Sequence, residues 1–350
     1  MYALFRSLLF ALPPEQAHRV AMIGLDYTTS LPLLRTACRQ LFCLEAPGLR
    51  RKYMGLTFAN PVGLAAGFDK NGCYLDALAC LGFGFIEVGT VTPRPQAGNP
   101  PPRLFRLPVD QALINRMGFN NEGVEALARR LQRWNERLQG EPRPIVGINI
   151  GKNKDTPNER AHEDYLTCFR ALALWADYFT INVSSPNTPG LRELQGKEPL
   201  LRLLDAIQEV NNRLNRPKPI LLKIAPDLTH DQLDEIAAVA KQAQLNGLIA
   251  TNTTLSRTGL RTPSSRLEAI GAGGLSGAPL RQRATEVIRY LRQRLDQKIL
   301  LIGVGGIDSP QAAQEKFQAG ADLIQIYTGL IYKGPGLIRK ILQGVQDNAQ

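Results

Sequence analysis

The chain has 350 residues and a formal net charge of +11; 44% of its residues are hydrophobic and 21% are charged, which is ordinary for a globular protein with a sizeable core. The Lys and Arg residues are scattered and accompany no RNA-binding or zinc-finger motif, so no nucleic-acid partner is expected. The five cysteines form no C-x-x-C pair, which argues against a disulfide framework and against cysteine-bound zinc.

The first 45 residues differ in pattern from the rest. Apolar residues recur at helical spacing from Ala17 to Leu25 and again from Leu34 to Phe42, and Pro32 separates the two runs. Two short amphipathic helices forming a hairpin are therefore predicted. The hairpin either caps the core or lies in a bilayer interface, and the segment alone does not decide between them. Residues 1–12 are too short for a signal peptide, and no apolar run is long enough to span a membrane.

From residue 60 onward, short apolar runs alternate with amphipathic helical stretches. Strand and helix repeated eight times imply parallel strands with both faces covered, hence a (β/α)₈ TIM barrel rather than a doubly wound open sheet. Extra length between residues 89 and 145, and between 251 and 299, predicts long loops that cover one face. The predicted strands are residues 62–66, 85–88, 145–150, 178–183, 220–224, 248–250, 299–304 and 323–326.

Each predicted strand ends in a polar residue or glycine, on the side of a barrel where active sites lie. The last two strand ends are rich in glycine: Gly305-Gly306 follows the seventh strand and Tyr327-Thr328-Gly329 the eighth. Ser309-Pro310 then reads as the N-cap and first residue of a helix. Barrels commonly bind phosphate at these two loops, so a phosphorylated ligand is predicted.

Other strand ends carry the carboxamides Asn149, Asn182 and Asn252. Each offers a donor and an acceptor, which suits a flat ring with N–H and C=O edges such as a flavin or a pyrimidine. No carboxylate ends a strand and the three histidines fall in helical contexts, so neither a metal site nor a histidine base is expected.

Two features are candidates for active chemistry. Lys223 ends the fifth strand in a buried-looking position, where it could form a Schiff base or stabilise an anionic flavin. The loop after Asn182 holds Ser184 and Ser185 between stiffening prolines, although a plain turn would have the same composition.

Eight motifs, in the same order along the chain, resemble those of the class 2, quinone-dependent dihydroorotate dehydrogenase family. The resemblance extends over the whole chain, from the N-terminal hairpin to the last helix. The motifs are residues 65–70 (AAGFDK), 115–121 (NRMGFNN), 147–153 (GINIGKN), 179–192 (FTINVSSPNTPGLR), 251–254 (TNTT), 273–277 (GGLSG), 303–308 (GVGGID) and 325–329 (QIYTG).

This resemblance implies an FMN enzyme that oxidises dihydroorotate to orotate in pyrimidine biosynthesis, with hydride passing to FMN and electrons to a membrane quinone. It implies Ser185 as the catalytic base. Implied substrate-binding residues are Lys70, Asn115, Arg116, Met117, Gly118, Phe119, Asn182, Asn187, Asn252 and Thr253. Implied FMN-binding residues are Ala66, Gly67, Phe68, Asp69, Lys70, Thr90, Asn149, Asn182, Lys223, Thr251, Gly277, Gly306, Tyr327 and Thr328. Implied quinone-tunnel residues are His18, Arg106 and Tyr327.

The sister class has cysteine at the base position, lacks the hairpin and uses soluble acceptors or an iron–sulfur partner. Serine at 185 and the hairpin imply a quinone acceptor and no iron–sulfur subunit. The implied organisation is a membrane and quinone-tunnel segment at residues 1–45 and an FMN-binding barrel at 46–350, attached peripherally to the anionic cytoplasmic face of the cell membrane. A Schiff-base aldolase using Lys223 and a non-enzymatic membrane scaffold are the rival interpretations.

Overall fold

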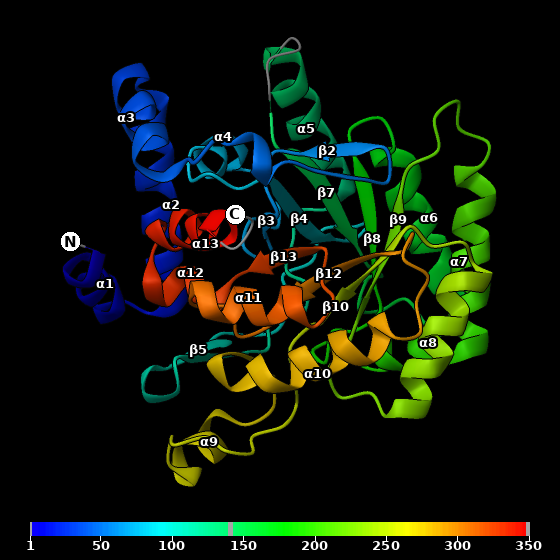
Figure 1. The fold of residues 1–350 in the computed structure, drawn as a ribbon. Helices are drawn as coiled ribbons and strands as arrows, with labels where there is room; N and C mark the ends of the chain where they lie inside the picture. The colour runs from blue at the N-terminus through cyan, green and yellow to red at the C-terminus, as the bar shows by residue number, and fades with distance from the viewer. Residues whose placement is uncertain (1, 139–142, 348–350) are drawn as a thin grey trace.

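The computed structural model describes residues 2–138 and 143–347. At its centre eight strands close into a barrel, and their order around the barrel is their order in the chain (Figure 1). The last strand pairs in parallel with the first, which confirms the predicted barrel and excludes an open sheet. The strands are β3 (Val62–Leu64), β4 (Phe85–Val91), β7 (Ile145–Ile150), β8 (Tyr178–Asn182), β9 (Ile220–Ile224), β10 (Gly247–Ala250), β12 (Leu300–Val304) and β13 (Leu323–Ile326).

Alternation along each strand decides which side chains enter the barrel. In β9, Ile220, Leu222 and Ile224 join the hydrophobic core between the strands and the surrounding helices. Leu221 instead belongs to the cluster inside the barrel. Because side chains alternate with a period of two, Lys223 shares the interior side with Leu221. Its place among apolar neighbours therefore follows from the strand itself.

Helices follow the strands and cover the outside of the barrel. In α5, the buried residues Val124, Leu127, Leu131 and Trp134 recur at helical spacing and form the stripe that faces the core. The predicted N-cap at Ser309 is confirmed, since its side chain accepts a hydrogen bond from the Ala312 N–H. The helices around the barrel are α4 (Leu75–Ala79), α5 (Val124–Leu138), α6 (Ala161–Leu172), α7 (Lys197–Asn211), α8 (His230–Gln242), α10 (Arg281–Arg292), α11 (Pro310–Gln318), α12 (Thr328–Lys333) and α13 (Gly336–Asp347). A further helix, α9 (Ser264–Ile270), lies away from the barrel (Figure 1).

The two long connections predicted as loops contain a small antiparallel sheet. Its strands are β5 (Leu104–Leu107), β6 (Ala112–Asn115) and β11 (Gly274–Gly277), with β6 in the middle. The segments LFRL and ALIN do not alternate strictly between apolar and polar residues, and β11 pairs with a segment about 160 residues away. A two-stranded hairpin, β1 (Arg51–Tyr53) and β2 (Leu56–Phe58), precedes the barrel; the Phe58 ring meets Phe85 edge-on at 5.3 Å. Short 3₁₀ turns complete the fold: η1 (Pro47–Leu49), η2 (Pro108–Asp110), η3 (Asn158–Arg160), η4 (Leu191–Gln195) and η5 (Ala278–Leu280).

Three helices, rather than the two predicted, precede the barrel. They are α1 (Tyr2–Ala11), α2 (Pro14–Ser30) and α3 (Pro32–Phe42), and they stand together on one side of the barrel, next to α12 and α13 (Figure 1). The helix α1 is apolar almost throughout and has no buried residue, so it lacks the polar and apolar faces on which the prediction depended. None of the helices in the described ranges is both long and apolar enough to cross a bilayer.

Candidate active site

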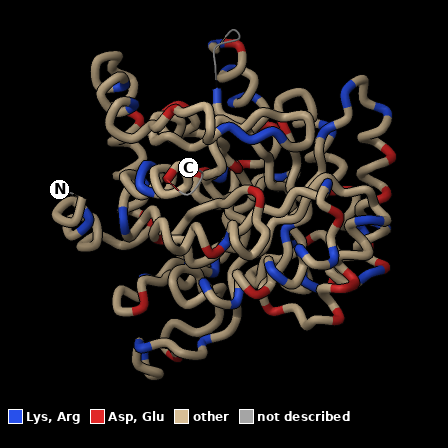
Figure 2. Tube along the Cα trace, in the orientation of Figure 1, with Lys and Arg blue, Asp and Glu red and all other residues tan. Residues whose placement is uncertain are grey.

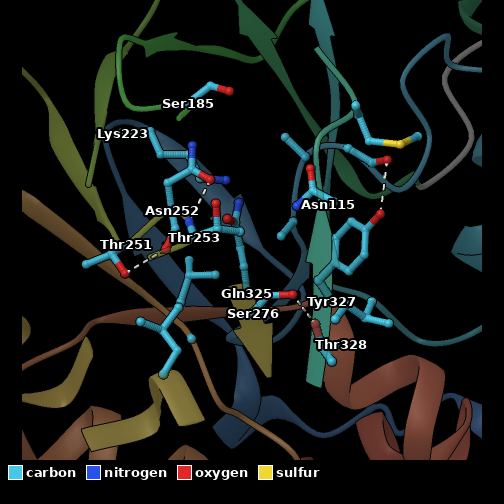
Figure 3. A pocket seen from close by; sticks show the side chains of 18 of the residues that line it. Asn115, Ser185, Lys223, Thr251, Asn252, Thr253, Ser276, Gln325, Tyr327 and Thr328 are labelled. Carbon is cyan, nitrogen blue, oxygen red and sulfur yellow. Dashed lines mark hydrogen bonds between the residues drawn. The ribbon is translucent and has the colours of Figure 1, made fainter. Parts of the chain in front are cut away.

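A cavity opens at the carboxyl ends of the barrel strands (Figure 3), and residues at the end of, or directly after, every barrel strand except β7 line it. Most of the predicted substrate and cofactor residues lie in this lining. They are Ala66, Gly67, Lys70, Thr90, Asn115, Met117, Gly118, Phe119, Asn182, Ser185, Asn187, Lys223, Thr251, Asn252, Thr253, Gly277, Gly306, Tyr327 and Thr328. The (β/α)₈ topology has therefore brought together residues that are up to 262 positions apart, from Ala66 to Thr328.

The remaining predicted residues lie elsewhere. Asn149 is fully buried beneath the lining, where its Oδ1 accepts hydrogen bonds from Thr90 Oγ1 (2.5 Å) and Asn182 Nδ2 (3.0 Å). Asp69 is buried and accepts from the backbone N–H groups of the turn that follows it. The Arg116 guanidinium donates to the carbonyls of Pro102 and Ala272, so this side chain holds two loops together outside the cavity lining.

A buried carboxylate that the sequence analysis missed lies under the cavity. Glu87 is fully buried in β4 and accepts hydrogen bonds from Asn149 Nδ2 (2.9 Å), Tyr178 Oη (3.2 Å), Thr180 Oγ1 (3.1 Å) and Gln325 Nε2 (2.9 Å). The prediction considered only the last residue of each strand, whereas Glu87 lies inside one. A glutamate within the apolar run FIEVG was the available signal.

Lys223 belongs to the lining directly beside this carboxylate network. Burial lowers the pKa of Lys223 below its ordinary value, and the negative charge of Glu87 opposes that shift. The nearby Glu87 carboxylate thus favours the charged form of Lys223, whereas burial disfavours it. Such a charge can stabilise an anionic ring above it.

The loop after β8 presents Ser185 to the cavity (Figure 3). Ser185 is 6% exposed, and its Oγ accepts a hydrogen bond from the Asn187 N–H at 3.3 Å. The neighbouring Ser184 is engaged elsewhere, because its Oγ donates to Asn182 Oδ1 (3.1 Å) and accepts from Asn252 Nδ2 (3.0 Å). Of the two adjacent serines, only Ser185 belongs to the lining.

Two polar atoms near the cavity have no hydrogen-bond partner within the described ranges. They are Thr253 Oγ1 and Gln325 Oε1, both buried and both on lining residues. Buried polar groups in folded proteins are almost always paired. These two atoms are therefore free to bind a polar ligand.

The glycine-rich end of the cavity lies between the loops after β12 and β13. A side chain at Gly306 would place its Cβ 2.5 Å from the Arg281 Cα, so only glycine permits the close approach of this loop to α10. Across the cavity, Ser276 Oγ and Thr328 Oγ1 lie 2.8 Å apart. The hydroxyls of Ser276 in β11 and Thr328 after β13, together with the closely packed backbone at Gly306, suit a phosphate, as the sequence predicts.

A second cavity of about 920 Å³ lies between α1, α2 and the barrel. Its lining contains the three residues predicted for the quinone tunnel, His18, Arg106 and Tyr327, and also Phe68 and Asp69. The two cavities share a wall, because six residues line both: Gly67, Lys70, Leu104, Leu113, Met117 and Tyr327.

An aromatic row lies along this wall. The ring of His18 meets Phe68 edge-on at 4.8 Å, and Phe68 meets Tyr327 at 5.4 Å. Burial, and then the charge of Lys70, lower the pKa of His18 to about 4, so its imidazole is neutral at pH 7. Arg106 donates to the carbonyls of Phe10 (3.2 Å) and Leu12 (2.8 Å), which fastens the end of α1 over the cavity.

Comparisons with known proteins agree with this geometry. A family model described as dihydroorotate dehydrogenase matches residues 48–348. The dihydroorotate dehydrogenase (quinone) of Christiangramia forsetii is 51% identical over 98% of this chain and 98% of that protein, and that of Alkalilimnicola ehrlichii is 51% identical over 99% of each. The crystal structure of ligand-free DHODH from Eimeria tenella superposes with a TM-score of 0.87 and 38% identity, covering 96% of this chain and 94% of that one. The chain therefore belongs to the quinone-dependent dihydroorotate dehydrogenase family, the oxidoreductases of pyrimidine biosynthesis.

Proposed function

We propose that this dihydroorotate:quinone oxidoreductase holds one FMN in the first cavity, oxidises dihydroorotate to orotate there, and admits a quinone to the second cavity. The observation that carries the proposal is the wall common to both cavities, formed by six residues that include Tyr327 and Lys70. FMN, when bound, accepts hydride from dihydroorotate and passes the electrons on to the quinone. Because the same residues line both cavities, the wall between them is thin. It would separate dihydroorotate from the quinone and still keep both close to the flavin ring.

The chemistry of the lining fits FMN. Asn182, Thr251 and the unpaired Gln325 Oε1 offer donors and acceptors for a flat ring with N–H and C=O edges. Lys223 supplies the positive charge that a reduced, anionic ring requires. Gly306 and Thr328 would hold the phosphate at the glycine-rich end.

The amide-lined side of the cavity suits the substrate. Asn115, Asn187 and Asn252 offer amides to the pyrimidine edge, and Asn187 Nδ2 already donates to Asn115 Oδ1 at 3.0 Å. The free Oγ1 of Thr253 can add a further contact. Ser185 would take the proton from C5 of dihydroorotate, because it is the serine of this loop whose hydroxyl reaches the cavity.

The absorption spectrum of the purified chain tests the proposal directly. We expect a yellow protein that dihydroorotate bleaches without oxygen and that a quinone then restores to yellow. Reduction with borohydride in the presence of a carbonyl substrate should leave no covalent adduct on Lys223. A colourless protein that forms such an adduct would support the aldolase interpretation instead.

Lys70 makes the binding of orotate dependent on pH. Burial, followed by the charge of Arg103, lowers the pKa of Lys70 to about 8. Lys70 is charged below that pH and can hold the orotate carboxylate, so the affinity for orotate should fall as the pH rises above about 8, by at most tenfold per unit. Titrating the FMN-loaded protein with orotate between pH 6.5 and 9.5 measures this. The Lys70→Gln variant should bind orotate more weakly at pH 7 and lose the dependence; an unchanged wild-type affinity at pH 9.5 would contradict the assignment.

The N-terminal helices are proposed to dock on a membrane. Of the fourteen exposed large hydrophobic side chains among the described residues, eleven belong to residues 2–42. Figure 2 shows Lys and Arg spread over the whole trace, and the same helices carry Arg6, Arg19, Arg35 and Arg39. An apolar surface with basic residues around it suits an interface with anionic lipid.

This docking would place the second cavity at the membrane surface. Residues 1–45 would form the membrane and quinone-tunnel segment, and 46–350 the FMN barrel, attached peripherally on the cytoplasmic side of the cell membrane. A quinone could then enter between α1 and α2, whose residues line the cavity, without leaving the bilayer interface.

A further inference from the structure

We propose that Arg192 is a positioning residue that fastens the loop of Ser185 to the loop of Asn252 and Thr253, and so sets where the base lies against the substrate. The inference rests on the proposed function, in which Ser185 is the base. Arg192 itself is absent from the cavity lining, so it acts through the two loops and does not touch the substrate.

One guanidinium reaches three strand ends. Arg192 lies in η4, directly after the Ser185 loop. Its Nε donates to the carbonyl of Ser184 at 3.0 Å and its Nη2 to the carbonyl of Thr253 at 3.0 Å. Its Nη1 forms an ion pair with Asp227 Oδ2 at 2.8 Å. The ends of β8, β9 and β10 are therefore joined at a single side chain.

The contact to Ser184 fixes the position of Ser185. The Ser184 carbonyl and the Ser185 N–H belong to one planar peptide unit, so holding the carbonyl orients the start of Ser185. No barrel strand extends into residues 183–190, and the loop cannot rely on a ladder of sheet hydrogen bonds. The guanidinium is planar and presents its donors in a rigid fork, which lets it fix two carbonyls relative to each other.

Asp227 holds the Arg192 side chain in place through their ion pair. Its carboxylate also accepts from the Leu255 N–H at 3.2 Å and from Thr254 Oγ1, so it holds the Thr253 loop from the other side. The side chains of Arg192 and Asp227 are 21% and 28% exposed, which leaves the pair partly shielded from water. Charge-assisted hydrogen bonds of this kind are stronger than neutral ones.

Substitution of Arg192 should slow the reduction of FMN by dihydroorotate and leave the reaction with quinone intact. A misplacement of reacting groups by about 1 Å costs roughly 10²-fold in rate, and we expect a loss of that order for Arg192→Ala. Arg192→Lys keeps the charge but cannot hold both carbonyls, so its loss should be intermediate. Stopped-flow measurements of the two half-reactions on the FMN-loaded, full-length protein separate these effects.

Arg143 provides a matched control. It forms an ion pair with Asp177 at 2.6 Å, with side chains 26% and 17% exposed, close to the start of the barrel strands. Arg143→Ala should lower the thermal unfolding temperature without slowing FMN reduction. Free guanidinium at millimolar concentration should speed FMN reduction in Arg192→Ala and have no such effect in Arg143→Ala. If Arg192→Ala does not fold, Asp227→Asn can be used instead. It removes the ion pair that holds Arg192 and should also slow FMN reduction.

A double-substitution cycle decides whether Arg192 acts through the base. If it does, Ser185→Ala combined with Arg192→Ala should reduce FMN no more slowly than Ser185→Ala alone. The inference about Arg192 would be wrong if the two losses multiply in the double variant, or if the Arg192→Ala rate lies within twofold of the wild-type rate. Neither result would contradict the role of Ser185. If Ser185→Ala by itself does not slow FMN reduction, the proposed role of Ser185 fails instead, whatever Arg192→Ala does.

Discussion

Ser185→Ala is expected to leave the protein yellow and to slow the reduction of its flavin by dihydroorotate by about 10² to 10⁴-fold, the usual cost of losing a general base. The hydroxyl faces the cavity, and within residues 2–138 and 143–347 its Oγ accepts only the hydrogen bond of the Asn187 N–H. It is therefore free to accept a proton from the substrate. Stopped-flow absorbance without oxygen measures the rate directly.

The two neighbouring serines distinguish a role in catalysis from a role in loop structure. Ser184→Ala should cost less than Ser185→Ala, because the Ser184 hydroxyl is bonded to Asn182 and Asn252 and does not line the cavity. Ser185→Cys should retain more activity than Ser185→Ala, since a thiolate also accepts a proton. Equal rates for the wild type and Ser185→Ala would remove Ser185 from the role of base.

Replacing Leu4, Leu8 and Leu33 together by glutamate is expected to abolish binding to anionic vesicles. These leucines are 77%, 72% and 87% exposed, so their replacement should cost little stability in the folded chain. Complete burial of one leucine contributes about 1.5–3 kcal/mol. Even about 1 kcal/mol for each partly inserted leucine amounts to roughly a 10²-fold loss of vesicle binding. Turnover with a long-tailed quinone should fall with it.

Leu174→Glu is the matched control for this surface. Leu174 is 83% exposed and follows α6, which lies on the opposite side of the barrel from α1, α2 and α3 in Figure 1. The Leu174→Glu variant should bind vesicles as the wild type does. Both proteins should reduce their flavin with dihydroorotate at the wild-type rate, because none of the four leucines lines the first cavity. Vesicle sedimentation that is unchanged in the triple variant would show that residues 2–42 only cap the barrel.

The sequence predicted the barrel well because its strands are buried on both faces. Continuous apolar runs mark such strands, and all eight observed strands agree with the predicted runs to within three residues at each end. The polar residue at each strand end was equally visible, since parallel strands bring their carboxyl ends to the same side. The Ser309 N-cap was predictable because it depends on residues that are adjacent in the chain.

Features that depend on distant contacts were not predicted. The sheet of β5, β6 and β11 forms only when segments far apart in the chain meet, and α1 has no amphipathic pattern of its own. Glu87 could have been noticed as a charge within an apolar run, but its four hydrogen-bond partners come from three other strands. Their convergence is a property of the closed barrel.

The sequence by itself determined the barrel, the strand-end residues and, through the family motifs, the class of reaction. Local hydrophobic patterning and short-range motifs specify these features. Only the tertiary structure decided that the two cavities share one wall, that Arg116 is not part of the cavity lining, and that Arg192 joins three loops. Those features depend on the direction of individual side chains in a packed interior, and this direction is set by neighbours that the sequence places far away.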